Sequence, residues 1–327
     1  LYRDFLKIFE PIIVPEGQIK TKPRACNYGL IRADGDYVTI YDAEDDPEPD
    51  QLKKALISFQ RMGPSCVCLQ SHLNFYNSNE NLLTKWFSLE YWYWYDYYLE
   101  GLDAIDAPIP LGGTSNHFKT KRLRELGSWD PYNVTEDADL GVRIYRSGLK
   151  TGMLNSYTYE EANKKVWDWI RQRSRWCKGH MQTYLVHMRH PRKMIRDTGW
   201  KKFVLFHLTF GGNILLPLIN PLLWTITILT LLFPETFSFL SYAPWITFIT
   251  TFNLIAGNLI HISLYLRTVI AEKRVSLIPV ALTMPLYWVL GSIGAWRGLI
   301  QLITKPHYWE KTMHGISKTR HLETINS

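Results

Sequence analysis

Acidic side chains gather in one short stretch of the sequence, where they could bind a divalent cation. Four carboxylates, Asp42, Glu44, Asp45 and Asp46, lie within five residues. Carboxylates this close repel one another unless a cation neutralises them, and hard divalent cations prefer carboxylate oxygens. The stretch therefore predicts a divalent-metal site, with a solvated acidic turn as the alternative.

A second acidic motif, Thr135-Glu136-Asp137, could supply a proton acceptor at the start of a predicted helix that ends near Gly148. Asn133 followed three residues later by Glu136 fits a capping box, so this glutamate has a structural explanation. Asp137 is not needed for the cap. A carboxylate near the start of a helix stays ionised more easily, which leaves Asp137 able to accept a proton.

A third group combines an amide, a guanidinium and an indole. Gln172, Arg175 and Trp176 would share one face of a helix, because they lie three and four residues apart. An arginine suits phosphate oxygens, and a tryptophan offers a flat apolar platform to a sugar ring. The alternative is an aromatic-rich amphipathic helix resting on a membrane surface, and both descriptions can hold together.

These side chains must be positioned by alternating strands and helices. A strand over 37–41 ends at the acidic stretch, and a helix over 49–61 and a strand over 65–70 follow. This rhythm predicts an α/β domain with a mostly parallel sheet, in which ligands bind beyond the carboxyl ends of the strands. A glycine-rich turn at 111–118 carries polar side chains that either bind a ligand or merely reverse the chain.

The second half of the sequence predicts a membrane region. Of the 327 residues, 46% are hydrophobic. Three apolar stretches, 203–233, 242–266 and 276–303, each exceed the roughly 20 residues that a helix needs to span a bilayer. The formal net charge is +7, and basic residues crowd before the first apolar stretch. They predict contact with anionic headgroups rather than nucleic-acid binding. These residues are Arg189, Arg192, Lys193, Arg196, Lys201 and Lys202.

The distribution of lysine and arginine predicts which loops face the cytoplasm. Basic residues before the first stretch, between the second and third stretches, and in the tail all favour the inside, whereas the loop at 234–242 has none. Three crossings would leave the tail outside. Either the third stretch lies along the interface, or the first stretch breaks at Pro217 and Pro221 into two short passes. We favour the interfacial helix.

In this order, the motifs resemble the processive family 2 glycosyltransferases, which include the cellulose and hyaluronan synthases. The resemblance covers roughly residues 14–315, and its most specific marks are Thr135-Glu136-Asp137 and Gln172-x-x-Arg175-Trp176. Residues 42–52 and 112–118 look more closely like a bacterial branch of polysaccharide synthases.

The resemblance implies a GT-A, Rossmann-like catalytic domain on the cytoplasmic side of a bacterial inner membrane, followed by α-helical membrane segments. It divides the chain into a partial GT-A domain (1–180), a basic interfacial linker (181–202), transmembrane or interfacial helices (203–303) and a cytoplasmic tail (304–327). Residues 305–315 of that tail resemble the gating loop of those synthases. The family's first nucleotide-binding strand has no match, so a partial chain is expected.

The matching motifs also imply roles for individual residues. Asp42 and Glu44 would hold Mg²⁺ or Mn²⁺, with Asp45 or Asp46 as alternatives, because a glutamate replaces the family's usual second aspartate. Asp137 matches the general base, with Glu136 and Thr135 beside it. Lys22, Asp42, Gln172 and Arg175 match the donor site, and Trp176, Gly113, Thr114 and Ser115 match the acceptor site.

The implied function is an inverting transfer of sugar from a UDP-sugar to a growing β-linked polysaccharide, processive and coupled to export. One alternative is a non-processive transferase that adds a single sugar to a lipid carrier, and the Gln-x-x-Arg-Trp motif argues against it. The other is a transporter or channel with a regulatory cytoplasmic domain. Charged residues are scarce in the apolar stretches, and intramembrane charges usually mark transport routes, which argues against this alternative.

Overall fold

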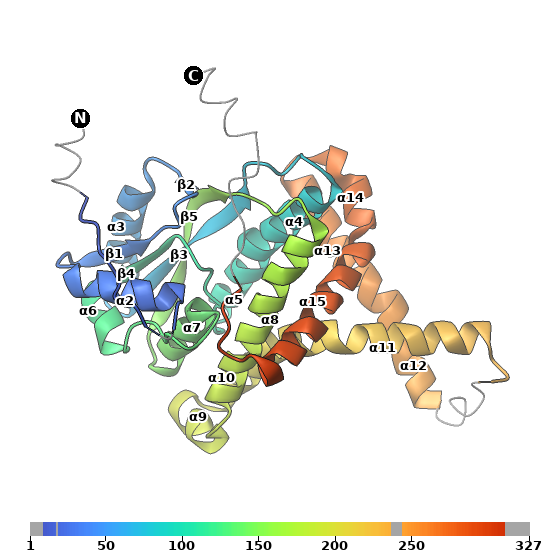
Figure 1. Cartoon of the computed structure of the whole chain (residues 1–327). Helices are drawn as coiled ribbons and strands as arrows, with labels where there is room; N and C mark the ends of the chain where they lie inside the picture. The colour runs from blue at the N-terminus through green and yellow to red at the C-terminus, as the bar shows by residue number, and fades with distance from the viewer. Residues whose placement is uncertain (1–8, 18, 237–243, 311–327) are drawn as a thin grey trace.

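A computed structural model describes residues 9–17, 19–236 and 244–310, which form an α/β domain followed by a helical part (Figure 1). Five described strands make one sheet in the order β1-β4-β3-β5-β2. They are β1 (Tyr37–Ile40), β2 (Asp46–Pro47), β3 (Cys66–Phe75), β4 (Asn116–Lys119) and β5 (Lys150–Glu160). The predicted strands at 37–41 and 65–70 are confirmed as β1 and β3.

The sheet is mixed, which corrects the expectation of a mostly parallel one. Among the described strands only β3 and β5 pair in parallel, whereas β4 runs antiparallel to β1 and β3, and β2 runs antiparallel to β5. The cause is the route into β4. The Ser115 N–H donates to the Ile40 carbonyl (2.7 Å), so β4 starts beside the carboxyl end of β1 and runs back along it.

Helices surround this sheet and carry the predicted motifs. The helix predicted over 49–61 is confirmed as α3, and the acidic motif opens α7. The helices of the domain are α2 (Lys22–Arg32), α3 (Gln51–Met62), α4 (Leu82–Tyr93), η1 (Trp94–Leu99), α5 (Glu100–Ala104), α6 (Thr120–Glu125), α7 (Glu136–Arg146) and α8 (Val166–His187).

The capping box predicted at the start of α7 is wrong. Thr135 occupies the N-cap position, and its side chain makes no capping hydrogen bond. Asn133 Oδ1 instead accepts from the Thr135 N–H (2.9 Å) in an Asx turn. This oxygen is therefore bonded before the helix begins and does not cap it. Glu136, the first residue of α7, is buried, and the absent cap does not explain its burial.

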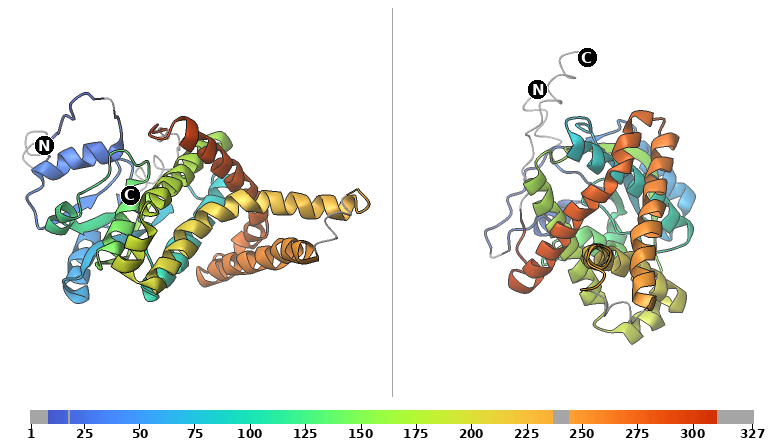
Figure 2. Two further views of the ribbon diagram at one scale, coloured as in Figure 1. Left: turned by 90° about the horizontal axis from the view of Figure 1, so that it is seen from below. Right: turned by 90° about the vertical axis from the view of Figure 1, so that its right-hand side faces the viewer.

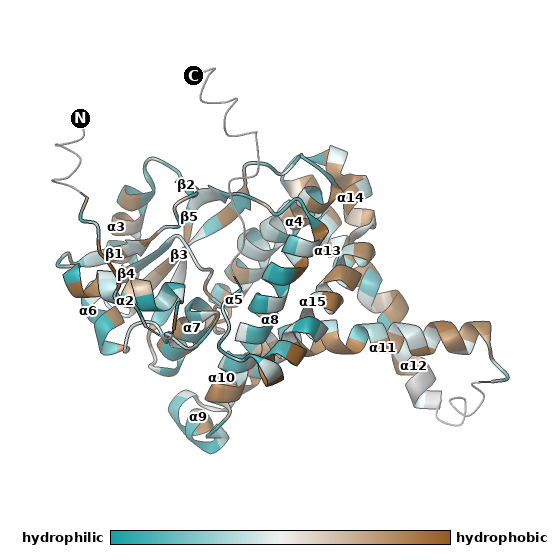
Figure 3. Cartoon of the chain, in the orientation of Figure 1, coloured by the Kyte–Doolittle hydropathy of each residue, from teal (hydrophilic) through white to brown (hydrophobic). Residues whose placement is uncertain are grey.

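The helical part follows α8 and extends away from the sheet (Figures 1 and 2). By length and composition, three helical segments among the described residues could cross a membrane: Trp200–Leu232, Phe248–Ala271 and Met284–Thr304. Most residues of α11 are apolar, and Figure 3 colours the ribbon by this hydropathy. The elements are α9 (Pro191–Thr198), α10 (Trp200–Phe206), η2 (His207–Gly211), α11 (Gly212–Leu232), α12 (Pro244–Phe252), η4 (Asn253–Gly257), α13 (Asn258–Ala271), η5 (Val275–Leu277), α14 (Ile278–Leu282) and α15 (Met284–Thr304).

Two predictions about these helices have different outcomes. The first apolar stretch does not break at Pro217 and Pro221, since α11 continues through both prolines. Each proline removes one backbone hydrogen bond, a loss that membrane helices tolerate. The prediction that the third stretch lies along the membrane interface stays a prediction; in the structure this stretch divides into α14, which ends at Leu282, and α15, which begins at Met284.

The last helix, α15, packs along α8, the helix that carries Gln172, Arg175 and Trp176 (Figures 1 and 2). Glycines allow the close approach. A Cβ atom at Gly294 would lie 2.9 Å from Arg173 Cγ, and one at Gly298 would lie 2.7 Å from the Ser174 carbonyl oxygen. Because larger side chains would collide with α8, these two glycines let the two helices touch.

Candidate active site

The acidic stretch after β1 lies against the start of α2. Lys22, the first residue of α2, donates from Nζ to Asp42 Oδ1 and to the Gly113 carbonyl oxygen (2.7 Å). Burial disfavours the lysine charge, but the carboxylates of Asp42 and Glu136 outweigh it and raise the pKa of Lys22. Lys22, Asp42 and Gly113, which were predicted in separate motifs, thus meet at one place, called here the carboxylate corner. Lys22 keeps its positive charge there.

Asp45 folds back onto the same corner. Its Oδ2 accepts from the Asp42 N–H (2.6 Å) and from the Thr114 hydroxyl, which orders the acidic loop. Its Oδ1 is buried and has no hydrogen-bond partner among the described residues. Burial raises the pKa of Asp45 to about 6, because a buried carboxylate with one unpartnered oxygen is costly to ionise.

The donor set fits a divalent cation. Asp42 and Asp45 lie at the corner, Glu44 is half-buried beside them, and Asp46 points an exposed side chain from β2. Within the described residues, no three His, Cys, Asp or Glu side chains lie close enough together to hold a metal by themselves. Mg²⁺ commonly takes one or two carboxylates and completes its shell with phosphate and water. A cation here would satisfy the unpartnered oxygen of Asp45.

Asp137 faces this corner from the start of α7. A Cβ atom at Gly113 would lie 3.3 Å from Asp137 Oδ2 and 3.8 Å from Lys22 Nζ, so the carboxylate points at the glycine turn. The Ala138 N–H donates to Asp137 Oδ1 (2.7 Å). Burial raises the pKa of Asp137, opposed by that N–H and by the charges of Lys22 and Arg175. The result is a carboxylate with one oxygen anchored and the other directed toward the turn.

The other two residues of the motif pack inside the protein. Glu136 is buried, and burial together with the Asp137 charge raises the pKa of Glu136. Thr135 lies against Gly179 of α8, where a Cβ atom would come within 2.3 Å of Thr135 Oγ1. Gly179 therefore lets α8 approach the start of α7, which fixes the distance between the acidic motif and the arginine on α8.

Arg175 reaches from α8 toward this motif. Its Nη1 donates to the Val134 carbonyl oxygen (3.3 Å), and its guanidinium lies 4.6 Å from the ring centre of Trp309. Burial lowers the pKa of Arg175, and the carboxylates of Glu136, Asp137 and Asp42 oppose this effect, the first most strongly. The arginine thus directs its positive charge at the same corner as Lys22.

Gln172 and Trp176 contact residues outside the acidic motifs. Gln172 Oε1 accepts from Asn163 Nδ2 (3.0 Å). Trp176 is half-buried and packs on α4, with its ring centre 6.0 Å from Phe87 and 6.4 Å from Tyr91. The structure therefore brings Arg175 to the carboxylate corner and places Trp176 against an aromatic wall.

Within the glycine-rich turn, Gly113 lies beside Lys22 and Asp137. The Ser115 hydroxyl donates to Thr158 Oγ1 (2.6 Å), and Ser115 is buried at a left-handed φ of 53°. The Thr114 hydroxyl is bonded to Asp45. Both hydroxyls are thus engaged with protein partners, and they shape the turn and the acidic loop.

Sequence reasoning missed two polar residues near this corner: Glu160, which ends β5, and Gln70, which lies within β3 and ended the strand predicted at 65–70. Gln70 accepts from the Gly112 N–H (2.8 Å) and donates to the Thr114 carbonyl oxygen (3.2 Å), which holds the turn open. Glu160 ends β5, and burial, with the charges of Asp45 and Asp42, raises the pKa of Glu160 well above its ordinary value. The available signal was position, because polar residues at strand ends line ligand sites.

The tail crosses α8 and covers Arg175. Lys178 Nζ donates to the Tyr308 carbonyl oxygen (2.7 Å), and Gln182 Nε2 donates to the Pro306 carbonyl oxygen (2.9 Å). These bonds set the ring of Trp309 over Arg175. The rest of the segment predicted to resemble a gating loop, 311–315, lies outside the described residues.

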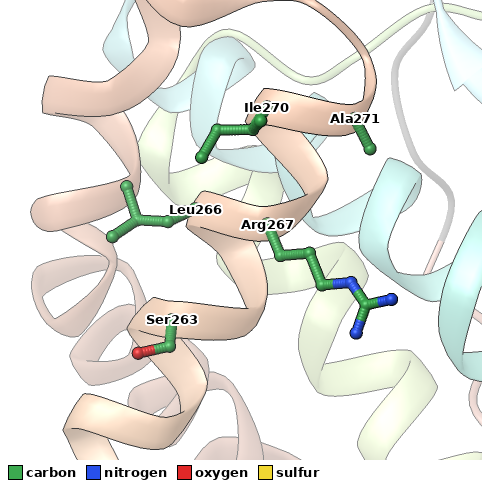
Figure 4. Close-up of a pocket in the computed structure, with 5 residues that line it drawn as sticks. All are labelled: Ser263, Leu266, Arg267, Ile270 and Ala271. Carbon is green, nitrogen blue, oxygen red and sulfur yellow. The ribbon is translucent and has the colours of Figure 1, made fainter.

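A separate depression lies on the helical part. It has a volume of about 370 Å³ and is lined by Ser263, Leu266, Arg267, Ile270 and Ala271 (Figure 4). All five residues belong to α13, which could cross a membrane, and none belongs to the carboxylate corner. The candidate active site is therefore the corner between β1, the glycine turn, α7 and α8.

The chain thus combines an α/β domain that carries a charged corner with helices that are long and apolar enough to cross a membrane. The sequence model of the glycosyl transferase family group 2 matches residues 37–296, so the chain belongs to this family. The probable glycosyltransferase YdaM of Bacillus subtilis is 25% identical over 228 residues, which cover 64% of this chain and 50% of that protein.

Two further proteins are similar. Glucomannan 4-beta-mannosyltransferase 2 of Arabidopsis thaliana is 27% identical over 235 residues, covering 68% of this chain and 42% of that protein. The chain thus spans about half the length of the curated relatives it matches. A mannosyltransferase from Pyrobaculum calidifontis, solved in complex with GDP-Man and Mn²⁺, aligns with a TM-score of 0.49 and 18% identity over 89% of this chain and 68% of that one.

Proposed function

We propose that the chain is the catalytic and membrane part of an inverting transferase. It would move a sugar from a UDP-sugar to the hydroxyl end of a growing β-linked glycan, on the cytoplasmic side of a bacterial inner membrane. The observation that carries this proposal is the direction of Asp137, whose Oδ2 faces Gly113 between the cations Lys22 and Arg175.

The reaction joins an acceptor hydroxyl to the anomeric carbon while the bond from that carbon to the diphosphate breaks. An alcohol is a weak nucleophile, so a base must take its proton as it attacks. Asp137 Oδ2 is directed toward the open turn, while the Ala138 N–H anchors Oδ1. General-base catalysis of this kind contributes about 10²–10⁴-fold. Attack in line with the leaving diphosphate converts an α-linked donor into a β-linked product.

Lys22 and Arg175 flank the corner and suit the diphosphate, which gains negative charge as it leaves. Asp42 and Asp45 are the carboxylates that would hold Mg²⁺ or Mn²⁺. A bound cation supplies further stabilisation of that charge. Thr114 fixes the direction of Asp45, and Gly113 leaves room for the donor beside Asp137.

Trp176 would stack on the terminal sugar of the acceptor and set the approach of its hydroxyl. Processive growth and export of the glycan through α11, α12 and α13 belong to this proposal, because these helices follow the α8 helix that carries Trp176. The name of the Arabidopsis relative, a glucomannan 4-beta-mannosyltransferase, supports an activated mannose as the alternative donor and a β-1,4-linked glucomannan as the product.

The test is nucleotide release by the purified full-length protein in lipid nanodiscs, with UDP-glucose, UDP-N-acetylglucosamine and GDP-mannose, each with Mg²⁺ or Mn²⁺. We expect metal-dependent release with one donor and its loss in Asp137→Asn. Release from no donor by a folded protein would overturn the proposal. The length of the product then separates processive synthesis from the addition of one sugar to a lipid carrier.

A further inference from the structure

Arg173, two residues before Arg175, is committed to partners inside the protein. Its Nη1 donates to Glu90 Oε1 (3.0 Å), and its Nη2 donates to Glu90 Oε2 and to the Tyr287 hydroxyl (3.1 Å). Glu90 lies on α4 and Tyr287 on α15, so one guanidinium joins three helices. Because Glu90 neutralises its charge, Arg173 is unsuited to bind the diphosphate, in contrast to Arg175.

The same guanidinium lies against the predicted acceptor platform. It is 4.9 Å from the ring centre of Trp176 and 4.7 Å from that of Trp169, which occupy neighbouring turns of α8. A third ring, Phe87 of α4, lies 5.6 Å away. A cation over an aromatic face is attractive, and more so when both are removed from water. The Arg173 guanidinium therefore packs against the Trp176 ring inside the protein. The two oxygens of Glu90, which both accept hydrogen bonds from Arg173, fix the position of the guanidinium.

The helix α15 limits the position of Arg173 from the other side. Tyr287 packs its ring 4.8 Å from Trp169, and its hydroxyl also donates to Glu90. Further along α15, the Cα of Gly294 lies so close that an added Cβ would meet Arg173 Cγ at 2.9 Å. Any shift of α15 against α8 would therefore move the guanidinium that backs Trp176.

We propose that Arg173 is a positioning residue that holds the Trp176 ring in place for the acceptor sugar, and that Tyr287 and Gly294 let α15 set this position. The proposal rests on the proposed function, since it takes Trp176 as the acceptor platform. It goes beyond that function by assigning α15 a part in acceptor binding. A rigid platform binds better than a mobile one because less freedom is lost when the sugar stacks.

The first test compares Arg173→Lys and Tyr287→Phe with the wild type in nucleotide-release assays on the full-length protein in nanodiscs. The acceptor probe is the β-1,4-linked tetrasaccharide of the sugar that the donor screen identifies, cellotetraose for UDP-glucose or β-1,4-mannotetraose for GDP-mannose, titrated at saturating donor. We expect the acceptor KM to rise about fivefold, which corresponds to about 1 kcal/mol at 1.4 kcal/mol per factor of ten. Release without acceptor, which reports donor hydrolysis, stays within twofold, and a fall in it equal to the loss in the acceptor reaction would overturn the proposal.

A double-mutant cycle tests whether Arg173 acts through Trp176. Trp176→Phe alone is expected to raise the acceptor KM, and adding Arg173→Lys to it should change the KM by less than twofold, since the platform is already lost. Independent effects that multiply in the double variant would mean that Arg173 serves the acceptor by another route, and would overturn the proposal.

A matched pair of glycine variants tests the part of α15. Gly294→Ala should raise the acceptor KM as Arg173→Lys does, because its new methyl group displaces Arg173. Gly291→Ala should behave as wild type, because a Cβ atom there meets no atom within 4 Å. Equal acceptor KM values in the two variants would overturn the assignment of α15.

The assays also separate this proposal from the proposed function. A wild-type protein that releases nucleotide from no donor refutes the function and the positioning role with it. An active wild type whose acceptor KM is unchanged in Arg173→Lys refutes the positioning role alone.

Discussion

Replacing Asp137 with asparagine tests the base directly, because the amide keeps the shape of the side chain but cannot take a proton. The asparagine carbonyl oxygen can still accept from the Ala138 N–H, which is 2.7 Å from Oδ1 in the structure. The second oxygen, which faces Gly113, becomes an amide that no longer attracts the acceptor proton. The change therefore removes the charge and the basicity and leaves the packing.

The expected loss follows from the role of a general base. Turnover should fall by about 10²–10⁴-fold, which corresponds to about 3–5 kcal/mol at 1.36 kcal/mol per factor of ten. Donor affinity should stay the same or improve, because Lys22 and Arg175 remain and one negative charge near the diphosphate is gone. A fall in turnover with an unchanged donor KM is the signature of an interaction made only in the transition state.

The pH profile gives an independent check. Burial raises the pKa of Asp137, and the base is active only when deprotonated. Wild-type kcat should therefore decline toward acid with a midpoint above the ordinary aspartate pKa of about 4. The residual activity of Asp137→Asn should lack this acid limb. Release assays from pH 5 to pH 8, with far-UV circular dichroism to verify folding, would measure both. Turnover above a tenth of the wild type in Asp137→Asn would refute the assignment.

Two further predictions follow from neighbouring contacts. Asp45→Asn should lower metal-dependent nucleotide release at least tenfold, while Asp46→Asn should stay within twofold because the Asp46 side chain is exposed on β2. Mn²⁺ titrations of both variants measure this. Equal metal requirements in the two variants would exclude Asp45 as a ligand. Gly179→Ala should lower the free energy of unfolding by about 1–3 kcal/mol, because its Cβ would collide with Thr135. Gly101→Ala, where a Cβ meets nothing within 4 Å, is the control in denaturant unfolding, and equal stabilities would contradict the packing.

Local features of this chain could be predicted from its sequence. The strand that ends at Asp42 and the helix that begins at the Thr135 motif were predicted at nearly their observed bounds. The apolar stretches also matched helices long enough to cross a membrane. Such features depend on residue type over a short window, where β-propensity, helix periodicity and hydropathy decide the structure.

Features that depend on distant residues could not be predicted. The direction of β4 follows from a route through more than thirty residues of helix and extended chain, and no local pattern encodes it. Lys22 meets the carbonyl of Gly113 across 91 residues, and Arg173 meets Tyr287 across 114. Helical spacing placed Arg175 and Trp176 on one face, but it could not show that Arg175 binds the Val134 carbonyl oxygen whereas Trp176 packs against Phe87 of α4.

The contacts at the two ends of the helical part bear on how often the chain crosses a membrane. Lys202, in the first turn of Trp200–Leu232, pairs with Asp106 of the α/β domain (2.9 Å), and after the third helix the Tyr308 carbonyl oxygen accepts from Lys178 of α8. Both ends therefore lie beside the α/β domain, whereas an odd number of crossings would separate them. Because α11 continues through its prolines, it does not split into two passes. We therefore propose that Trp200–Leu232 and Phe248–Ala271 cross the membrane and that α15, which packs along α8, lies at its interface; this arrangement meets the condition and keeps Trp309 over Arg175.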